Sequence, residues 1–297
     1  MTAAMVLSAG LGTRLAPLTD ELAKPLMPVG DRPAVVHIAD ALGRAGISTI
    51  VVNTHHRPGD FSREIKGWKP EVHLVHEPVI LGTAGGVAHA AAALGPGPVV
   101  VWNGDILAPA LDVAALIARH REASAGALWV VQPAGVGQGT VGLDDEGRVV
   151  RLRGERFGLE TSGGDFLGVQ VIGPELRRTL PGTGCLVADV ALPLLRHGGR
   201  IDTFLYRGEW DDIGQPASLL RANLRWLEAR GLQAWSAAGT TIEARARLER
   251  SLVGEGAAVA GAGVVRECVV FPGARLDAPA SRVLAAARAM LTVDDGV

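Results

Sequence analysis

The chain has 297 residues, of which 48% are apolar, and carries a formal net charge of −2. This length and composition exclude a disordered chain and suit one large domain with a smaller one. The absence of a long Lys or Arg run argues against a nucleic-acid surface, and no apolar run approaches the roughly 20 residues that cross a bilayer. Two cysteines form no disulfide framework and no signal peptide is evident, so we expect a cytoplasmic protein.

The first 230 residues alternate short apolar strands with amphipathic helices. We expect strands over 3–10, 48–53, 71–77, 98–105 and 127–133, and helices over 34–46, 83–94 and 112–125. This alternation is typical of a Rossmann-like α/β fold, a mostly parallel sheet with helices on both faces. Because ligands of such sheets bind beyond the carboxyl ends of the strands, we expect the loop after the first strand and Asp105 at one edge.

The middle of the chain is less regular. The pattern predicts a hairpin over 140–155, turning near residues 145–147, and a strand over 165–173. A further strand is expected within 201–214, followed by a helix over 215–231 that ends at a glycine.

Beyond about residue 236 the apolar residues recur every five or six positions among Gly and Ala. They are Ile242, Leu248, Val253, Val259, Val265, Val270 and Leu276. This rhythm predicts a short left-handed β-helix of about two coils, a cap over 236–297 behind a main domain over 1–235. A disordered Gly- and Ala-rich tail is the alternative. Residues 281–290 are expected to form a closing helix.

The stretch 8–25, "SAGLGTRLAPLTDELAKP", follows the first strand. Gly10 and Gly12 let the backbone approach a ligand and present N–H groups to it. Arg14 offers a planar fork for phosphate oxygens, Thr13 adds a hydroxyl, and Lys24 can fold back as a second cation. The stretch is neither a Walker loop nor a complete dinucleotide fingerprint. We expect it to hold the phosphates of a nucleoside triphosphate.

The longer string "LSAGLGTRLAPLTDELAKPLMPVGDRP" resembles the G-x-G-T-R-L-x-P-L-T-x-x-x-P-K-P signature of sugar-1-phosphate nucleotidylyltransferases. Ala23 departs from it, since the family has proline there. Three later segments match in order: "LGTAGGV" resembles the loop against the nucleobase, "NGD" the metal-binding strand end, and "GEWDDIGQP" the W-x-D-x-G signature. The resemblance spans nearly the whole chain and makes residues 1–235 the expected catalytic domain.

Two acidic residues of these motifs are candidate ligands of Mg²⁺. Asp105 follows an expected buried strand, and Asp212 lies in the W-x-D-x-G turn, whose spacing selects it over Asp211. Mg²⁺ binds a few carboxylate oxygens together with phosphates and water. A lone aspartate at a turn is more often a cap, so the proposal depends on both residues serving one phosphate site.

The resemblance implies a direct displacement at phosphorus. An oxygen of a sugar 1-phosphate attacks the α-phosphorus of the triphosphate, and pyrophosphate leaves. The nucleophile is already ionised, so the protein aligns two polyanions and neutralises charge instead of supplying a general base. We expect Arg14 to stabilise the departing pyrophosphate and Lys24 to contact the α-phosphate or the incoming sugar phosphate.

The nucleobase and the sugar are expected to meet backbone groups. Nucleobase contacts are expected near Leu7 and Ala9 and in the loop containing Gly82 and Gly85. Family alignment places the sugar beside Gly139 and Gly168, and Asn53, which ends a strand near the site, is expected to contact the sugar. Glu77 is left open, as a contact of the base or sugar or as a structural surface residue.

The residues expected to bind the sugar phosphate depart from the family pattern. Many members carry Glu-Lys-Pro after the hairpin, whereas this chain has Gly154 and Glu155 there, with no Lys. Arg151 or Arg153 could supply the missing cation. The adjacent His55 and His56 are expected at the surface or the substrate rim, because neighbouring loop histidines point apart.

Several functions stay open on the sequence alone. We favour GTP with mannose 1-phosphate or a related sugar; a UTP-dependent sugar-1-phosphate uridylyltransferase is the alternative. A catalytically silent paralogue that binds nucleotide sugar and regulates a partner is a third. An acyltransferase is excluded because about two coils form no groove for coenzyme A. A homo-oligomer is possible, since β-helix tails often help subunits pair.

Overall fold

The computed structural model describes residues 2–65, 72–123 and 126–294. Their contacts divide the chain into two compact units. The first unit comprises Met1–Gly10 and Ile38–Trp210, and the second comprises Leu11–His37 and Asp211–Val297. Among the described residues, no helix combines the length and apolar character needed to cross a membrane. The expected strand 71–77 and helix 112–125 each extend into residues outside these ranges.

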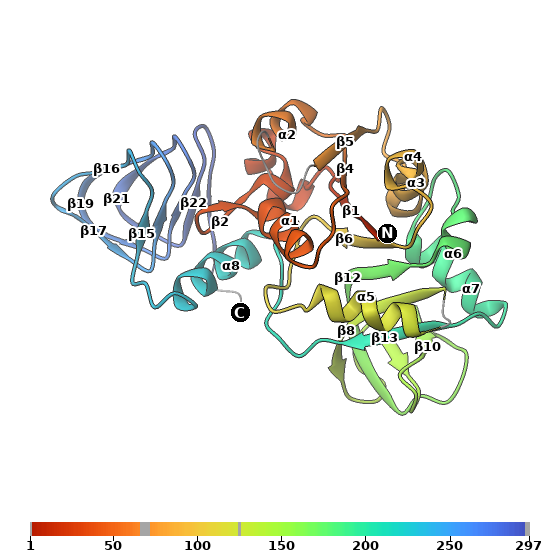
Figure 1. Ribbon diagram of the computed structural model, residues 1–297. Coiled ribbons are helices and arrows are strands. Elements are labelled where there is room, and N and C mark those ends of the chain that lie inside the picture. The colour runs from red at the N-terminus through yellow and green to blue at the C-terminus, as the bar shows by residue number, and fades with distance from the viewer. Residues whose placement is uncertain (1, 66–71, 124–125, 295–297) are drawn as a thin grey trace. The chain divides into compact units, whose positions relative to one another are not determined.

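The first unit is built on a sheet ordered β11-β10-β9-β12-β6-β1-β4-β5, with β8 pairing β12 and β13 (Figure 1). Its strands are β1 (Ala3–Leu7), β4 (Ile50–Thr54), β5 (Val72–His76), β6 (Val99–Asn103), β8 (Ala127–Ala134), β9 (Val141–Leu143), β10 (Val149–Leu152), β11 (Glu155–Arg156), β12 (Ser162–Ile172) and β13 (Ile201–Leu205); β7 (Ile106–Leu107) lies off this sheet.

The strands β6, β1, β4 and β5 run parallel, as the alternation of strands and helices predicts. Leu7 stands in register with Asn53 on one side and with Asn103 on the other. The carboxyl ends of three parallel strands therefore meet at one edge. This register confirms that the loop after β1 and the Gly104–Asp105 turn share that edge.

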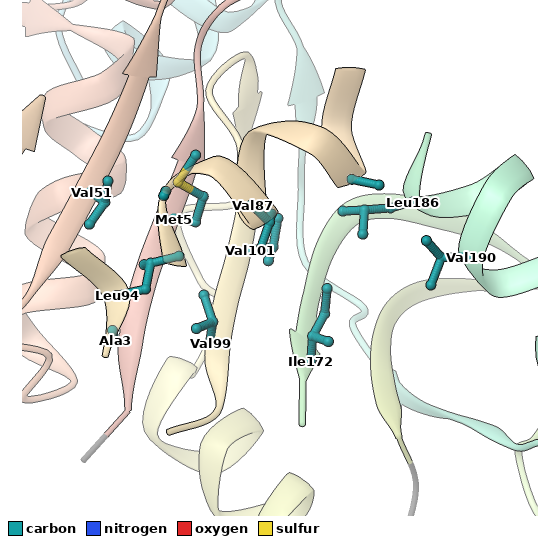
Figure 2. Close-up of a cluster of buried hydrophobic side chains, with 12 residues drawn as sticks. Ala3, Met5, Val51, Val87, Leu94, Val99, Val101, Ile172, Leu186 and Val190 are labelled. Atoms are coloured by element: carbon teal, nitrogen blue, oxygen red, sulfur yellow. The ribbon is translucent and has the colours of Figure 1, made fainter. Parts of the chain in front are cut away.

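The helices of the first unit bury one face of these strands. Figure 2 shows Met5, Val51 and Val101 facing Val87 of α3 and Leu94 of α4. Each fully buried aliphatic side chain contributes about 1.5–3 kcal/mol of transfer free energy. The helices of this unit are α2 (Pro58–Glu64), α3 (Gly82–His89), α4 (Ala91–Leu94), α5 (Val113–Glu122), α6 (Pro174–Arg178), the π-helix η4 (Leu186–Ala191) and α7 (Leu192–Arg196); α1 (Ala34–Arg44) begins in the second unit and ends in the first.

The sheet is mixed, because its other half is antiparallel. β12 runs antiparallel to β6, β8 and β9, and β9 pairs antiparallel with β10. The predicted hairpin is confirmed, with Asp144 accepting the Arg148 N–H across its turn. Trp129 and Phe166 stack within this half, with 4.1 Å between ring centroids.

The second unit begins with three short 3-10 turns and a hairpin that pack on α8. These elements are η1 (Thr13–Leu15), η2 (Leu18–Asp20), η3 (Lys24–Leu26), β2 (Pro28–Val29), β3 (Arg32–Pro33), β14 (Asp211–Asp212) and α8 (Pro216–Glu228). Asn223, fully buried on α8, accepts the Gly30 N–H at 2.8 Å and donates to the Pro28 carbonyl at 3.0 Å. One amide side chain thus fastens the hairpin to the helix.

The C-terminal segment forms stacked strands, parallel except for β23, and is not a disordered tail. They are β15 (Trp235–Ser236), β16 (Thr241–Ile242), β17 (Ala246–Glu249), β18 (Leu252–Val253), β19 (Ala258–Arg266), β20 (Val269–Val270), β21 (Arg275–Ser281), β22 (Val283–Ala285) and β23 (Met290–Thr292). Trp235 pairs with Leu252, which pairs with Val269 one coil further on. The first two steps of this stack therefore span 17 residues each, and the last step, from Val269 to Leu284, spans 15.

The expected closing helix over 281–290 is wrong. β22 and β23 form an antiparallel hairpin there, with Leu284 opposite Leu291. Leu284 is fully buried against the preceding coil, which extends the parallel stack by one more strand. Local helix propensity of the Ala-rich stretch gives way to this burial.

Candidate functional site

The loop after β1 is held by hydrogen bonds at its first residues, and its backbone faces open space at Gly10. The Ser8 N–H donates to Asn53 Oδ1 at 2.7 Å, and the Leu7 carbonyl accepts the Gly104 N–H at 2.9 Å. Ala9 is buried, whereas a Cβ on Gly10 would have no described atom within 4 Å. The backbone therefore reaches open space at Gly10, where a ligand could approach it.

Asn53 and Glu77 form a buried polar link under this loop. Asn53 Nδ2 donates to Glu77 Oε1 at 2.7 Å, while the other carboxylate oxygen accepts the Leu81 N–H at 3.0 Å. Glu77 is fully buried, so the expected surface position is wrong, and its bonds to Asn53 and Leu81 give it a structural role in the interior. Both ends of the Asn53 amide have protein partners and the side chain is buried, so a sugar contact by Asn53 stays a prediction.

The glycines of the "LGTAGG" loop pack against a second loop. A Cβ on Gly82 would lie 2.4 Å from the Gly184 carbonyl oxygen, and one on Gly85 would lie 2.6 Å from that of Gly182. The Thr83 hydroxyl also accepts the Leu186 N–H at 2.8 Å. Close backbone packing accounts for both glycines, and their contact with a nucleobase stays a prediction.

The glycines expected beside the sugar are likewise in tight contact with protein. Gly139 has φ +69° and faces the Gly164 carbonyl, where a Cβ would come within 2.3 Å. Gly168 has φ +73° and faces the Asn103 side chain, where a Cβ added to the glycine would lie 2.4 Å from the Asn103 amide nitrogen. Both positions need glycine for conformation and space, whatever binds there.

Arg151 is engaged by the protein itself. Its guanidinium bonds both Glu160 oxygens, at 2.9 and 3.1 Å, and three backbone carbonyls of residues 138–141. Its side chain is 13% exposed. These bonds leave Arg151 poorly suited to hold a sugar phosphate, and Arg153, which is exposed with φ +49°, is the better of the two candidates.

This ion pair predicts an acid-sensitive contribution to stability. The Arg151 guanidinium, with the Gly137 N–H, holds the pKa of the Glu160 carboxyl below its usual 4.5. A depressed folded-state pKa stabilises the fold above pH 4.5, and the contribution is lost as pH falls through the folded pKa. Glu160→Gln should therefore lower Tm at pH 7, and the gap to the parent should close below pH 4.5.

The exposed Glu155–Arg196 pair is the matched control for that measurement. Glu155→Gln should change Tm far less, because solvent screens an exposed pair. A Glu160→Gln variant as stable as the parent at pH 7 would contradict the assignment.

In the second unit, the two predicted cations lie on short 3-10 turns, Arg14 on η1 and Lys24 on η3. Gly12, with φ +68°, precedes η1, and its carbonyl accepts the Thr19 hydroxyl at 3.3 Å. A Cβ on Gly12 would stand 3.1 Å from the Lys24 Cβ, so the chain does fold back to bring Lys24 beside the glycine. Ala23, in place of the family's proline, keeps φ −60°, the value that proline imposes. The approach to Lys24 is therefore preserved.

The W-x-D-x-G turn separates its two aspartates by environment. Asp211 is buried and accepts ion pairs from Arg221 and Arg225 of α8, at 2.8 and 3.1 Å. Asp212 is half-buried and accepts the Gly214 N–H at 2.8 Å. The two arginines occupy Asp211, which favours Asp212 as the ligand.

Arg14 reaches the same turn. A Cβ on Gly214 would lie 2.6 Å from an Arg14 guanidinium nitrogen and 2.8 Å from Asp212 Oδ1. Gly214 thus leaves room for a cation and a carboxylate side by side. Arg14 and Thr13 are both exposed, so their polar groups are accessible to a ligand.

The space at Gly214 gives a test that separates activity from folding. Gly214→Ala should keep the fold, because the added methyl meets the far end of the Arg14 side chain, but should displace Arg14 and Asp212. Misplacement by about 1 Å can cost on the order of 100-fold in rate. Turnover and Tm of the variant check this, with Gly59→Ala, whose Cβ meets no described atom within 4 Å, as control. Unchanged turnover would show that the arrangement has no part in the reaction.

Sequence reasoning did not single out Arg221 and Arg225. They stand four residues apart on α8, so both reach Asp211 from one helix face. The R-x-x-x-R spacing directly after the W-x-D-x-G turn was the available signal.

Within residues 2–65, 72–123 and 126–294, no group of three or more His, Cys, Asp or Glu side chains is placed to hold a metal. Mg²⁺ is usually held by one or two carboxylates together with substrate phosphates. Asp105 and Asp212 are half-buried hard oxygen donors, so their chemistry fits the ion. The ring nitrogen Nδ1 of His55 forms a hydrogen bond with the Glu77 carbonyl oxygen, at 2.8 Å.

A family model described as nucleotidyl transferase matches residues 3–154, about half of the chain. The chain belongs to the nucleotidyl transferase family. This nucleotidyl transferase is 30% identical over 291 residues to the mannose-1-phosphate guanylyltransferase of Mycobacterium tuberculosis, covering 92% of this chain and 78% of that protein. It is 33% identical over 245 residues to the N-acetylmuramate alpha-1-phosphate uridylyltransferase of Caulobacter vibrioides, covering 76% and 97%.

Solved structures agree with the fold of this nucleotidyl transferase. HddC from Yersinia pseudotuberculosis, crystallised with GMP-PN, superposes with a TM-score of 0.63 at 20% identity, over 76% of this chain and 100% of that one. A putative glucose-1-phosphate thymidylyltransferase from Bacillus anthracis superposes with a TM-score of 0.64 at 20% identity, over 75% and 94%. At this level of identity the likeness concerns the fold alone.

Proposed function

We propose that this nucleotidyl transferase joins a nucleoside monophosphate to a sugar 1-phosphate, releasing pyrophosphate and forming a nucleoside diphosphate sugar. The observation that carries the proposal is the turn at Gly214, where the Arg14 guanidinium and the Asp212 carboxylate meet. A cation beside a carboxylate next to a phosphate-type glycine loop suits a triphosphate and its metal ion. The relatives named for sugar-1-phosphate chemistry support the same reaction.

The chain's own residues bind and align two polyanions. A sugar-phosphate oxygen forms a bond to the α-phosphorus, and the bond to the β-phosphate oxygen breaks. Arg14 neutralises the pyrophosphate that departs, and Lys24 holds the α-phosphate or the sugar phosphate. Gly10, Gly12 and Thr13 direct backbone and hydroxyl donors at the phosphates.

Mg²⁺ is the cofactor that we propose, with Asp105 and Asp212 as its protein ligands. When bound, the ion neutralises charge at the reacting phosphate oxygens. The carboxylates are suited to this task because both are half-buried, and Asp212 Oδ1 is held by the Gly214 N–H.

GTP is the nucleotide that we favour, with mannose 1-phosphate or a related sugar. The guanylyltransferase relative, aligned over 92% of this chain, supports this choice. We place the nucleobase against the backbone at Leu7 and Ala9 and the loop of Gly82 and Gly85.

The second candidate is a UTP-dependent reaction on a sugar 1-phosphate. The uridylyltransferase relative supports it, at 33% identity with 97% of its length aligned. The missing Glu-Lys-Pro leaves the identity of the sugar open between these two candidates. We place the sugar near Gly139, Gly168 and Asn53. A silent regulatory paralogue is the third candidate; the presence of Arg14, Lys24, Asp105 and Asp212 favours an active enzyme.

Pyrophosphate release with a panel of nucleotides decides among the three. The enzyme is incubated with Mg²⁺ and each of GTP, UTP, ATP, CTP and dTTP, paired in turn with mannose, glucose and N-acetylmuramate 1-phosphates. We expect the highest kcat/KM with GTP and mannose 1-phosphate. A UTP preference supports the second candidate, and nucleotide-sugar binding without turnover supports the third.

Four features of the wider assignment remain proposals. The catalytic domain extends over 1–235, and the cap over 236–297 winds as a left-handed β-helix. The protein acts in the cytoplasm, and its cap helps it to form a homo-oligomer.

A further inference from the structure

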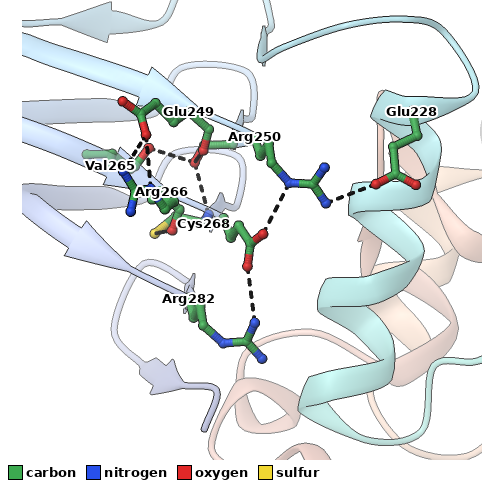
Figure 3. A network of polar contacts seen from close by, with 9 residues as sticks. Glu228, Glu249, Arg250, Val265, Arg266, Cys268 and Arg282 are labelled. Carbon is green, nitrogen blue, oxygen red and sulfur yellow. Dashed lines mark hydrogen bonds and ion pairs between the residues drawn. The ribbon is translucent and has the colours of Figure 1, made fainter. Parts of the chain in front are cut away.

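A charged pocket lies between α8 and the stacked C-terminal coils, within the second unit. Its volume is about 270 Å³. Its charged lining consists of four arginines and two glutamates: Arg221, Arg225, Arg250, Arg282, Glu228 and Glu267. Figure 3 shows Arg250 extending from the coils to Glu228 of the helix, with Arg282 on a later coil. Arg250 and Arg282 each donate to one carboxylate oxygen of Glu267.

The coil side of the pocket is a ladder of residues in the left-handed backbone region. Arg250, Glu267 and Arg282 have φ of +48°, +50° and +55°. Each occupies the same corner of a successive coil, two residues before the paired residues Leu252, Val269 and Leu284 of β18, β20 and β22. An L-residue in this conformation costs on the order of 1 kcal/mol or more, which glycine avoids.

Most positions with positive φ in the described part of this chain are occupied by glycine. In the described part of the chain, eighteen glycines have positive φ, against five other residues, and three of those five are the corner ladder. A corner that only had to turn would be built from glycine. Strained positions that keep their side chains point to a task for those side chains, which here is to present an alternating row of charges to the pocket.

Two carboxylates are each shared by a pair of guanidiniums. Glu267 is shared by Arg250 and Arg282, and Asp211 is shared by Arg221 and Arg225. All four of these guanidiniums line the pocket. The arginine side chains are 28–48% exposed, so a ligand can contact their guanidinium groups without any rearrangement of the pocket lining.

We propose that this pocket binds a small phosphoryl-bearing anion, and that its occupancy lowers the turnover of the enzyme. Phosphate oxygens accept paired bonds from guanidinium forks, which makes arginine clusters suited to this class of ligand. An anion that draws Arg221 and Arg225 toward the pocket loosens their hold on Asp211. Asp211 is the chain neighbour of Asp212, so the effect reaches the turn at Gly214 directly.

The binding half of this inference is independent of the reaction, whereas the effect on turnover rests on the proposed function. Calorimetric titration of the full-length protein with inorganic phosphate tests binding. We expect Arg250→Gln/Arg282→Gln to weaken the affinity at least tenfold. Arg266→Gln is the matched control, since Arg266 pairs with Glu249 on the same coils but does not line the pocket. Arg14→Ala should retain this binding, which separates the pocket from the phosphate loop.

Equal affinity in the parent and the double variant, or loss of binding in Arg14→Ala alone, would overturn the pocket assignment. The second arm measures pyrophosphate release at saturating substrates with increasing phosphate. We expect a severalfold decrease in the parent and in Arg266→Gln, and none in the double variant. Binding that leaves the parent's turnover unchanged would overturn the coupling. An enzyme without turnover on any substrate pair would contradict the proposed function and leave the titration result valid.

Discussion

Asp105→Asn should reduce pyrophosphate release at least about 100-fold while the protein keeps its Tm. Losing one preorganised electrostatic group at a reacting centre typically costs 100- to 1,000-fold in rate. The substituted amide would keep the shape of the side chain but lose the charge that balances a divalent cation. The residue follows β6, whose register with β1 places it at the edge of the nucleotide loop. Initial rates over a range of Mg²⁺ concentrations measure the effect.

Asp145→Asn is the control for this substitution. Asp145 is exposed at the tip of the β9–β10 hairpin, so the same loss of one carboxylate should leave turnover within a factor of two. If Asp105→Asn keeps near-parental rates at every Mg²⁺ concentration, Asp105 does not bind the metal.

Arg14→Ala should lower kcat/KM by about 100- to 1,000-fold, since the departing pyrophosphate would lose its charge-assisted donor. Arg14 is exposed, so its removal leaves no buried group unpaired and Tm should be unchanged. Arg14→Lys should recover only part of the loss, because a point charge does not reproduce the planar fork.

Arg32→Ala serves as the comparison for Arg14. Arg32 is an exposed residue of the β2–β3 hairpin in the same unit, and its removal should have little effect on kcat/KM. Equal rates for Arg14→Ala and Arg32→Ala would remove Arg14 from the reaction.

The parallel strands and their shared carboxyl edge could be predicted from the sequence, whereas their order in the sheet was not predicted. Continuous apolar runs such as "AAMVL" are buried on both faces and can only be inner strands, so their carboxyl edge was predictable. The fold-back of Lys24 could also be anticipated, because glycine and proline restrict the backbone of this loop locally. The choice of Asp212 over Asp211 came from the family signature and stays a prediction.

Features that depend on tertiary partners could not be read in the same way. Gly82 and Gly85 pack on the 182–184 loop, about 100 residues away, and nothing local signals that approach. Arg151 is occupied by Glu160 and backbone carbonyls, which no spacing rule foretells. The stretch 281–290 has an Ala-rich helical composition, yet burial of Leu284 against the previous coil makes it a hairpin.

The central claim is that the bond between the α- and β-phosphates breaks and the α-phosphorus passes to the sugar phosphate. Phosphorus NMR of one mixture of enzyme, Mg²⁺, GTP and mannose 1-phosphate tests it directly. The account predicts equal growth of two signals, free pyrophosphate and a nucleoside diphosphate sugar, as both substrates disappear. Orthophosphate appearing from GTP while mannose 1-phosphate stays intact would contradict it, provided that UTP and the other sugar 1-phosphates give the same result.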